Sequence, residues 1–552
     1  MRALETVIAE TPAARATSLM VGFTDVTVSI PFPWRDFIVK VTSMEKTTAV
    51  IDLDLPGARI SRHVYGHFAE HLGRCIYGGF YVGEDSDVPN ERGIRLDVVE
   101  ALRALNIPNL RWPGGCFADD YHWRDGIGPR DERPRMVNSH WGDVVEDNSF
   151  GTHEFMDLCE LLGTEAYIAG NVGSGSVAEM SEWIEYLTRA DDSPMAALRR
   201  ANGRDEPWKV PYFGIGNEAW GCGGNLRVEQ FASLARQYST YVRNHAGNDV
   251  YRIAAGASDG DLHWTEVLMQ SFDALDKPEE SERPAGPFQA ISLHYYTMTG
   301  PWADKGAATQ FTEDEWYLAL ERARFMDHLL TRHGQVMDRY DPAKRVGLVV
   351  DEWGTWWNVE PGTNPGFLYQ QNTLRDALVA SVHFDAFHQH ADRVVMANIA
   401  QTVNVLQAML LTDPETGALV RTPSYHVFEM NTGHHDADSL DVHLQGVPTR
   451  AGEKAELPLV SASASTRGGT ALVSLTNLDA TAERTVVLDL RGREVTAHSG
   501  RVLSAPELAT HNTPDAPDAV APVALEAIRP HERGLEVTLP AHSYATVSLT
   551  LA

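Results

Sequence analysis

Eight short β-like runs, most of them followed by a helical pattern, recur between residues 63 and 399. Two of the segments between them, Val228–Val242 and Trp316–His333, carry apolar residues at helical spacing. Alternation of strands with helices implies parallel strands joined by crossover helices, and eight such repeats predict an α/β fold of the closed (β/α)8 TIM-barrel type. The runs are His63–Phe68, Ile107–Trp112, Glu165–Gly170, Pro211–Asn217, Tyr251–Gly256, Ala290–His294, Val346–Glu352 and Arg393–Ile399.

The sequence changes character after about residue 430, where short runs rich in Val, Thr and Leu replace the long helical patterns. Turn residues separate these runs, which predicts a C-terminal antiparallel β-sandwich, jelly-roll-like in type. Ser504–Val523 is expected to be a long loop. The run Thr47–Leu53 has no partner in the barrel and is expected to pair into the sandwich. The predicted sandwich strands are Leu457–Ser465, Thr470–Asn477, Arg484–Leu490, Gly534–Leu539 and Ser543–Leu551.

Four regions are therefore expected along the chain: an extension over residues 1–43, a strand region over 44–60, the barrel over 61–425 and the sandwich over 426–552. The first 43 residues lack the pattern of a secretory signal. Met44 opens a stretch that reads like the natural start of a strand. We interpret residues 1–43 as a disordered or mis-called extension.

Charge, apolar runs and cysteine content limit the partners and the compartment that this chain suits. The formal net charge of −30 argues against nucleic acid or an anionic membrane as a partner. No apolar run approaches the ~20 residues that span a bilayer. The four cysteines, Cys75, Cys116, Cys159 and Cys222, form no C-x-x-C pair and no zinc spacing, and few scattered thiols suit a reducing compartment.

Two of the eight runs lead to a glutamate: Glu218 directly follows Pro211–Asn217, and Glu352 ends Val346–Glu352 after Asp351. The carboxyl ends of barrel strands are where catalytic groups lie, and two carboxylates are what hydrolysis of a glycosidic bond needs. Either glutamate alone could be a solvated strand end, but the pair favours a glycosidase. Retaining enzymes hold the two groups ~5–5.5 Å apart and inverting enzymes ~6.5–9.5 Å apart. The sequence does not fix that distance.

Seven segments, in order along the chain, resemble the α-L-arabinofuranosidases of glycoside hydrolase family 51. They are Tyr65–Arg74, Arg111–Phe117, Trp123–Pro129, Gly216–Glu218, Ile291–Tyr296, Asp351–Trp353 and Ala400–Val405.

This resemblance implies a retaining mechanism with Glu218 as general acid/base and Glu352 as nucleophile. It also implies Arg111 and His294 as supporting residues and no metal or organic cofactor. Arg111 could instead form an ordinary ion pair at a strand end. The implied sugar-contacting residues are Glu70, Asn217, Tyr296, Gln401, Cys116, Trp302 and Trp353, with Trp356 as a further part of an apolar wall. For Glu70 the alternative is an ion pair with Arg74 one helical turn on.

The sequence departs from the family pattern at two places. Cys116 stands where an asparagine is expected to bond the sugar, so this contact is missing or comes from Asp119 or Asp120. The segment Ala219–Gly224 also differs from the familiar form. Both departures concern sugar and aglycone preference rather than the type of reaction.

Other interpretations stay open. Gly256–Gly260 matches the G-x-S-x-G elbow of serine hydrolases, with Ser258 as nucleophile. Gly214–Ala219 resembles a dinucleotide-binding G-x-G-x-x-A, but no helix is expected to begin there. A non-catalytic carbohydrate-binding protein is a further possibility. Within the family, a β-xylosidase or an endo-β-glucanase is the main alternative, and the loops Gly78–Gly93, Asn138–Asn148 and Gly300–Glu313 decide between pocket and cleft.

We therefore expect a cytoplasmic, exo-acting α-L-arabinofuranosidase that releases terminal arabinofuranose from arabino-oligosaccharides or glycoconjugates. The resemblance further implies a homo-oligomer, commonly a hexamer. Neither nucleic acid nor a membrane is expected as a partner.

Overall fold

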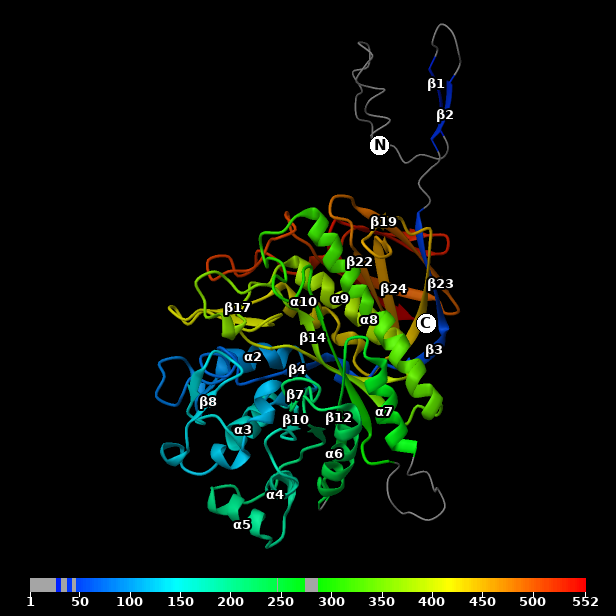
Figure 1. Ribbon diagram of the computed structural model, residues 1–552. Coiled ribbons are helices and arrows are strands. Elements are labelled where there is room, and N and C mark those ends of the chain that lie inside the picture. Colours follow the sequence, from blue (N-terminus) through cyan, green and yellow to red (C-terminus); the bar gives the residue numbers. More distant parts are fainter. Residues whose placement is uncertain (1–25, 31–36, 42–45, 246, 274–285) are drawn as a thin grey trace. The chain divides into compact units, whose positions relative to one another are not determined.

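The structure, a computed structural model, describes residues 26–30, 37–41, 46–245, 247–273 and 286–552 (Figure 1). The chain forms two compact units, Met1–Lys46 and Thr47–Ala552. In the first unit, β1 (Val26–Ile30) pairs antiparallel with β2 (Phe37–Val41). Most of the expected extension over residues 1–43, and Met44 itself, lie outside the described residues.

Eight parallel strands in the second unit close into a barrel, in the order in which the sequence predicts them (Figure 1). Each strand overlaps one predicted run, and the last strand pairs back onto the first. The prediction of a TIM barrel is confirmed. The barrel strands are β4 (Gly66–Phe68), β7 (Asn109–Trp112), β10 (Glu165–Gly170), β11 (Tyr212–Ile215), β12 (Tyr251–Ser258), β13 (Ala290–Thr297), β14 (Gly347–Thr355) and β15 (Val394–Ile399).

Both segments with helical spacing are helices, α6 (Val228–Tyr241) and α8 (Glu313–Tyr340). The first turn of α8 is fixed by a capping box in which Thr312 and Glu315 satisfy each other's backbone N–H groups. The other α-helices are α2 (Leu96–Ala104), α3 (Thr152–Leu162), α4 (Val177–Thr188), α5 (Pro194–Ala201), α7 (Leu262–Asp273), α9 (Leu374–Gln389) and α10 (Pro423–Met430). No helix in the described ranges is both long enough and apolar enough to cross a membrane.

Strand β14 contains one extra residue relative to β13. Against β13, Val349 faces Ser292 while Glu352 faces His294, so three steps on β14 match two on β13. The register against β15 shifts in the same part of the strand. Such a bulge re-aims side chains, and here it lets the consecutive residues Asp351 and Glu352 both serve the carboxyl end of the barrel.

The C-terminal strands form one ten-stranded sheet in the order β25-β24-β28-β22-β21-β18-β3-β23-β27-β26. Strand β3 (Thr47–Arg59) lies inside it, antiparallel to β18 (Asp438–Gln445) and parallel to β23 (Arg484–Arg491). The sandwich was expected to be antiparallel throughout, and the β3–β23 pair is the exception. The other strands are β21 (Val460–Arg467), β22 (Thr470–Asn477), β24 (Val495–Leu503), β25 (Val523–Ala524), β26 (Ile528–His531), β27 (Gly534–Leu539) and β28 (Ser543–Leu551).

This sheet folds over on itself around a second apolar core. Buried apolar residues from each of β3, β22, β24, β27 and β28 contribute to one cluster. A side chain at Gly500 of β24 would come within 2.7 Å of Ile528 in β26, so strands from the two ends of the sheet face each other. The segment between β24 and β25 has no helix or extended strand, which matches the long loop expected over Ser504–Val523.

Helix α9 joins the barrel to this sheet and is buried on nearly every side. Ser381 of α9 hydrogen-bonds Thr476 of β22 at 3.0 Å, and His388 hydrogen-bonds Ser463 of β21 at 3.0 Å. Because buried polar groups without partners cost free energy, these pairs fix the position of α9 against the sheet.

A disulfide joins Cys116 to Cys222, 106 residues apart in the sequence. It connects the short helix η2 (Cys116–Asp119) after β7 to the loop after β11. The sequence does not predict this bond, because nothing in the spacing of the two cysteines brings two barrel loops together. Cys75 and Cys159 are buried free thiols.

We predict that Cys222→Ser lowers the free energy of unfolding of the oxidised protein by about 2–5 kcal/mol, because it opens a long covalent loop in the unfolded chain. Guanidinium chloride unfolding followed by tryptophan fluorescence measures the change. In the presence of dithiothreitol the difference from the wild type should vanish, and Cys159→Ala serves as a thiol control without this redox dependence. Equal midpoints for wild type and Cys222→Ser without reductant would contradict the prediction.

Candidate active site

A cavity of about 400 Å³ opens at the carboxyl end of the barrel strands. Its walls come from the ends of seven strands, β4, β7, β11, β12, β13, β14 and β15, and from the segments that follow them, which is the usual construction of a TIM-barrel site. The residues that line it include Glu70, Gly115, Cys116, Trp141, Glu218, Ser258, His294, Tyr296, Trp302, Glu352, Trp356, Leu368, Gln401 and Leu406.

Glu218 and Glu352 face each other in this cavity. One carboxylate oxygen of each lies within 4.8 Å of the other, and the same holds for a ring nitrogen of His294. This separation matches the ~5–5.5 Å of retaining glycosidases and falls short of the ~6.5–9.5 Å of inverting ones. Glu218 has a positive φ of 37°, so the chain after β11 turns sharply to present its side chain.

Glu352 is buried and accepts hydrogen bonds from two sides. Arg111 Nη1 donates to its Oε1 at 3.0 Å, and the Tyr296 hydroxyl donates to its Oε2 at 3.0 Å. Burial raises the pKa of Glu352, and the charge of Glu218 raises it further against the cations His294 and Arg111.

His294 connects the acidic groups. Its Nδ1 lies 2.8 Å from Glu218 Oε1 and 3.5 Å from Glu352 Oε2, and its Nε2 lies 3.1 Å from Asp351 Oδ1. Burial alone would lower the pKa of His294, but Glu352, Asp351 and Glu218 together raise it to about 10. The imidazole is thus an imidazolium at neutral pH and donates from both nitrogens.

Arg111 hydrogen-bonds Glu352, as expected for a supporting residue, and two further groups. It donates to the Asp351 carbonyl at 2.8 Å and to Asn217 Oδ1 at 2.6 Å. Asn217 is 1% exposed and does not line the cavity, so in this arrangement its side chain serves Arg111. Burial opposes the charge of Asp351, but Arg111 and His294 hold its pKa at about 2.

Glu70 also lines the cavity and is 1% exposed. It accepts hydrogen bonds from Trp141 Nε1 at 2.9 Å and from Gln401 Nε2 at 2.6 Å. Burial, with a contribution from Glu352, raises the pKa of Glu70 to about 8. The alternative ion pair with Arg74 is wrong, since the Arg74 guanidinium donates instead to Thr412.

The need for glycine in the Pro-Gly-Gly segment after β7 is explained by the position of Glu70. A Cβ on Gly115 would lie 2.6 Å from Glu70 Oε1 and 2.9 Å from its Oε2. Any larger residue at position 115 would therefore displace the Glu70 carboxylate.

Cys116 reaches the cavity as part of the disulfide. Its sulfur lies 3.9 Å from Glu218 Oε2, and the Cys222 sulfur lies 3.5 Å from the same oxygen. Neither bonded sulfur carries a proton, so both are apolar, polarisable neighbours of Glu218 rather than donors.

The suggestion that Asp119 or Asp120 replaces the missing asparagine is wrong, because neither lines the cavity. Asp119 accepts backbone N–H groups of Val172 at 2.9 Å, Gly173 at 2.8 Å and Asn217 at 3.1 Å. Asp120 pairs with His140 at 3.1 Å. Asp119 thus fixes the two loops that carry the site.

The three tryptophans of the expected apolar wall separate into two groups. Trp302 and Trp356 line the cavity, with ring centroids 4.8 Å apart, and Trp302 is 64% exposed. The expectation that Trp353 contacts the sugar is wrong, because Trp353 is 0% exposed and packs against His383 and Phe387 of α9. Because side chains alternate along a strand, the residue after the inward-facing Glu352 points outward, into the core.

Three further residues of the site were not singled out from the sequence. Asp351 and Tyr167 anchor the charge cluster, since the Tyr167 hydroxyl donates to Asp351 Oδ2 at 2.7 Å. Trp141 comes from the tip of a hairpin between β8 (Met136–Asn138) and β9 (Val144–Glu146). Asp351 adjoins Glu352 in a predicted strand end, whereas the path of the hairpin that carries Trp141 has no local sequence signal.

The competing motifs do not assemble. Ser258 lines the cavity, but no described histidine hydrogen-bonds its hydroxyl, and the serine-hydrolase interpretation lacks its base. The run Gly214–Ala219 leads into a loop, and the next helix, α6, begins only at Val228. A dinucleotide phosphate would lack the helix N-terminus that it needs there.

We predict that Glu70→Gln gains stability relative to the wild type as pH rises. A carboxyl group with a raised folded-state pKa contributes fully below its unfolded value of about 4.5, and this contribution is lost as pH rises towards 8. Between pH 5 and 8 the difference in unfolding free energy should shift in favour of the variant by about 1.4 kcal/mol per pH unit. Urea unfolding of both proteins across that range checks this, and a pH-independent difference would count against a raised pKa for Glu70.

Comparison with known proteins agrees with this geometry. Residues 101–272 match the family described as Alpha-L-arabinofuranosidase 1 domain, and residues 351–543 match Alpha-L-arabinofuranosidase C-terminal domain. The chain is 48% identical over 512 residues to an intracellular exo-alpha-L-arabinofuranosidase of Bacteroides ovatus, covering 93% of this chain and 97% of the relative.

Solved structures give the same result. The GH51 arabinofuranosidase from Xanthomonas axonopodis pv. citri is 52% identical, with a TM-score of 0.87 over 92% of this chain and 100% of that one. The arabinose complex of the alpha-L-arabinofuranosidase from Thermotoga maritima is 29% identical, with a TM-score of 0.78 over 92% of this chain and 100% of that one. The chain therefore belongs to the α-L-arabinofuranosidases of glycoside hydrolase family 51.

Proposed function

We propose that this protein is a retaining, exo-acting α-L-arabinofuranosidase that releases terminal arabinofuranose from arabino-oligosaccharides or glycoconjugates. The observation that carries the proposal is the approach of one Glu218 and one Glu352 carboxylate oxygen to within 4.8 Å in one cavity. An approach this close supports a retaining pair and a covalent intermediate.

The hydrogen bonds distinguish the two glutamates. Glu352 accepts from Arg111 and Tyr296, with His294 at 3.5 Å, whereas Glu218 accepts from His294 alone. Donors stabilise the ionised form of a carboxyl group. This difference supports the proposal that Glu352 is the nucleophile and Glu218 the general acid/base.

The reaction follows from these two states. Glu352 attacks the anomeric carbon while Glu218 gives its proton to the departing glycosidic oxygen, and a covalent arabinosyl-enzyme forms. Glu218, now ionised, then removes a proton from water, which attacks the same carbon and releases Glu352. The imidazolium of His294 stabilises whichever glutamate is ionised at each stage, since it lies near both.

Glu70 and Gln401 are proposed to bind furanose hydroxyls, and Tyr296 to hold Glu352 in place. Asn217 is proposed to reach the sugar 2-hydroxyl from its position beside Arg111. Trp302 and Trp356 supply an apolar rim for the group that leaves.

A cytoplasmic location is proposed because the Bacteroides ovatus relative is an intracellular enzyme. Disulfides are rare in reducing compartments, so the state of the Cys116–Cys222 pair there is a measurable question that thiol alkylation in intact cells answers. A homo-oligomer, as a hexamer, is proposed from the resemblance alone, and light scattering of the purified protein tests it.

A panel of nitrophenyl glycosides tests the substrate. The wild type should hydrolyse the α-L-arabinofuranoside and leave the β-xyloside and β-glucoside largely intact. Preferential hydrolysis of the β-xyloside, or internal cleavage of a β-glucan, would replace this proposal by one of the two alternatives within the family.

Azide separates the roles of the two glutamates. Glu218→Ala should slow hydrolysis of poor leaving groups by roughly 100- to 10,000-fold, with azide restoring turnover and giving the arabinosyl azide of retained configuration. Glu352→Ala should be rescued only by direct attack of azide, which gives the inverted configuration. Nuclear magnetic resonance of the two products reads out the difference, and a reversed pattern would exchange the two assignments.

A further inference from the structure

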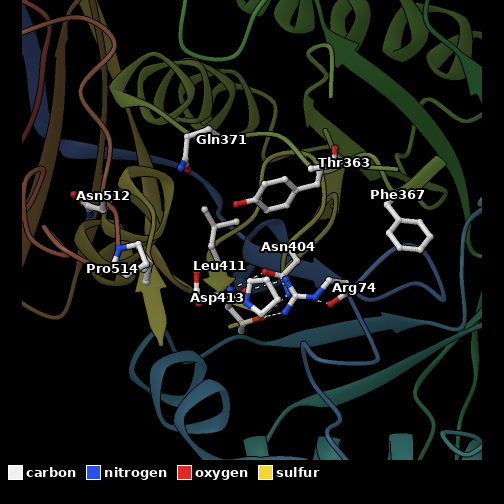
Figure 2. A pocket seen from close by; sticks show the side chains of 13 residues that line it. Arg74, Thr363, Phe367, Gln371, Asn404, Leu411, Asp413, Asn512 and Pro514 are labelled. Atoms are coloured by element: carbon white, nitrogen blue, oxygen red, sulfur yellow. Dashed lines mark hydrogen bonds between the residues drawn. The ribbon is translucent and has the colours of Figure 1, made fainter. Parts of the chain in front are cut away.

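A second cavity, of about 330 Å³, lies beside the first and has no role in the reaction above (Figure 2). Its walls come from the chain after β4, the segment between β14 and α9, the region around β16 (Leu410–Thr412) and β17 (Leu419–Arg421), and the loop after β24. Ligand pockets span ~300–1,000 Å³, so this cavity suits a small molecule.

The two cavities share a wall. Leu368 and Leu406 line the cavity of the glutamates, while their neighbours Tyr369 and Asn404 line the second cavity. The Leu406 N–H donates to the Leu368 carbonyl at 3.0 Å, which joins the two parts of the wall. Both leucines have a positive φ of 49°, uncommon for such residues, and strained backbone of this kind persists where the surroundings impose it.

Three polar side chains of the second cavity, Arg74, Tyr369 and Gln371, are available to a ligand. The Arg74 guanidinium donates to Thr412 at 2.9 and 3.0 Å, yet it forms no ion pair with any carboxylate of the described chain. Burial lowers the pKa of Arg74. Among the described residues, none hydrogen-bonds the Tyr369 hydroxyl or the Gln371 side-chain NH2 group. Figure 2 places Gln371 across the cavity from Arg74.

Aromatic and apolar surface completes the lining. The rings of Tyr369 and Phe367 border the cavity, and Tyr369 packs on the small cluster of Leu411 and Val420. Rings that stack on C–H faces, combined with planar polar side chains that bond hydroxyl groups, are suited to a sugar.

We propose that this cavity is a second, non-catalytic binding site for a short neutral saccharide. A sugar ring stacks on Tyr369, and its hydroxyl groups accept from Arg74 and Gln371 and donate to Asp413.

Charge favours a neutral sugar over an anionic ligand. Asp413 lines the cavity near Arg74, and its carboxylate is fixed by three local donors to one oxygen, the N–H groups of Glu415 and Thr416 and the Thr416 hydroxyl. An anion that approached Arg74 would also approach this carboxylate in a chain of net charge −30. A diol can donate to Asp413 and accept from Arg74 at once.

The proposal rests on the proposed function for its choice of sugar, an arabinofuranosyl oligosaccharide. Equilibrium dialysis with radiolabelled linear arabinotriose tests it in Glu352→Gln, which keeps the catalytic cavity without turnover. We expect two bound molecules per chain. Adding Tyr369→Ala or, as a second variant, Gln371→Leu should reduce this to one and so halve the sugar bound at saturation.

Tyr241→Ala is the matched control, since Tyr241 is an exposed tyrosine at the end of α6, outside both cavities. It should still bind two molecules, and thermal unfolding should show that each variant is folded. One molecule bound by Glu352→Gln itself, or two bound after both Tyr369→Ala and Gln371→Leu, would overturn the proposal. Preference for glucuronate over arabinotriose at this site would overturn the neutral-sugar assignment.

Failure of the proposed function and failure of the second site would give different experimental results. If the wild type hydrolyses no arabinofuranoside, the enzyme assignment fails, while dialysis with xylotriose and other neutral sugars still counts the sites. If hydrolysis is normal and the count is one, only the second site fails.

Discussion

The site depends on the neutralisation of a buried cluster of charges. Glu70, Glu218 and Glu352 line one cavity, the buried Asp351 contacts His294 and Arg111 beside it, and Arg111 and His294 bring two cations. Burying unpaired charges costs several kcal/mol each, so four ionised carboxylates against two cations would be strongly unfavourable. Burial raises the pKa of Glu70 to about 8, so Glu70 is mostly neutral at neutral pH and adds little negative charge to the cluster. Arg111 and His294 then face the three remaining carboxyl groups, with which they form the ion pairs of the site.

The surrounding backbone is shaped to hold this cluster. Asp119 binds N–H groups from the loops after β10 and β11, and the disulfide ties the loop after β7 to that after β11. A Cβ on Gly223 would lie 1.9 Å from the Asn217 carbonyl, so the loop can close over Asn217 only with glycine there. The segment Ala219–Gly224, which departs from the familiar family form, is thus constrained by packing around Asn217 and by the disulfide. Rigid support of this kind keeps catalytic groups within the small tolerance that chemistry allows.

The barrel and the glutamate pair can be predicted from the sequence, because strand–helix alternation and strand-end glutamates are local signals. The residues that surround the pair are less predictable. Simple alternation would turn both Asp351 and Trp353 away from the site, and only the extra residue in β14 keeps Asp351 inside. Trp353 could have been assigned to the core from alternation alone. The contact of Trp141 with Glu70 and the Cys116–Cys222 bond depend on loop paths, which no periodicity encodes. The parallel pairing of β3 with β23 is likewise a property of the closed sheet rather than of either strand.

The C-terminal sheet is structurally part of the active site's support. Strand β3 lies in the middle of that sheet, so the chain just before the barrel is held by strands that follow it. The loop after β24 reaches back to the barrel: the Leu374 N–H at the start of α9 donates to the Thr510 carbonyl at 3.1 Å, and Asn512 donates to the Arg421 carbonyl at 2.8 Å. The segment that ends at Leu374 contains Leu368 and Tyr369, which form the wall between the two cavities. Because this wall has a strained backbone and few regular hydrogen bonds of its own, its position depends on the loop and on α9. A displacement of the C-terminal sheet would therefore reach Leu368, and through it the cavity of the two glutamates, without any change in the barrel strands.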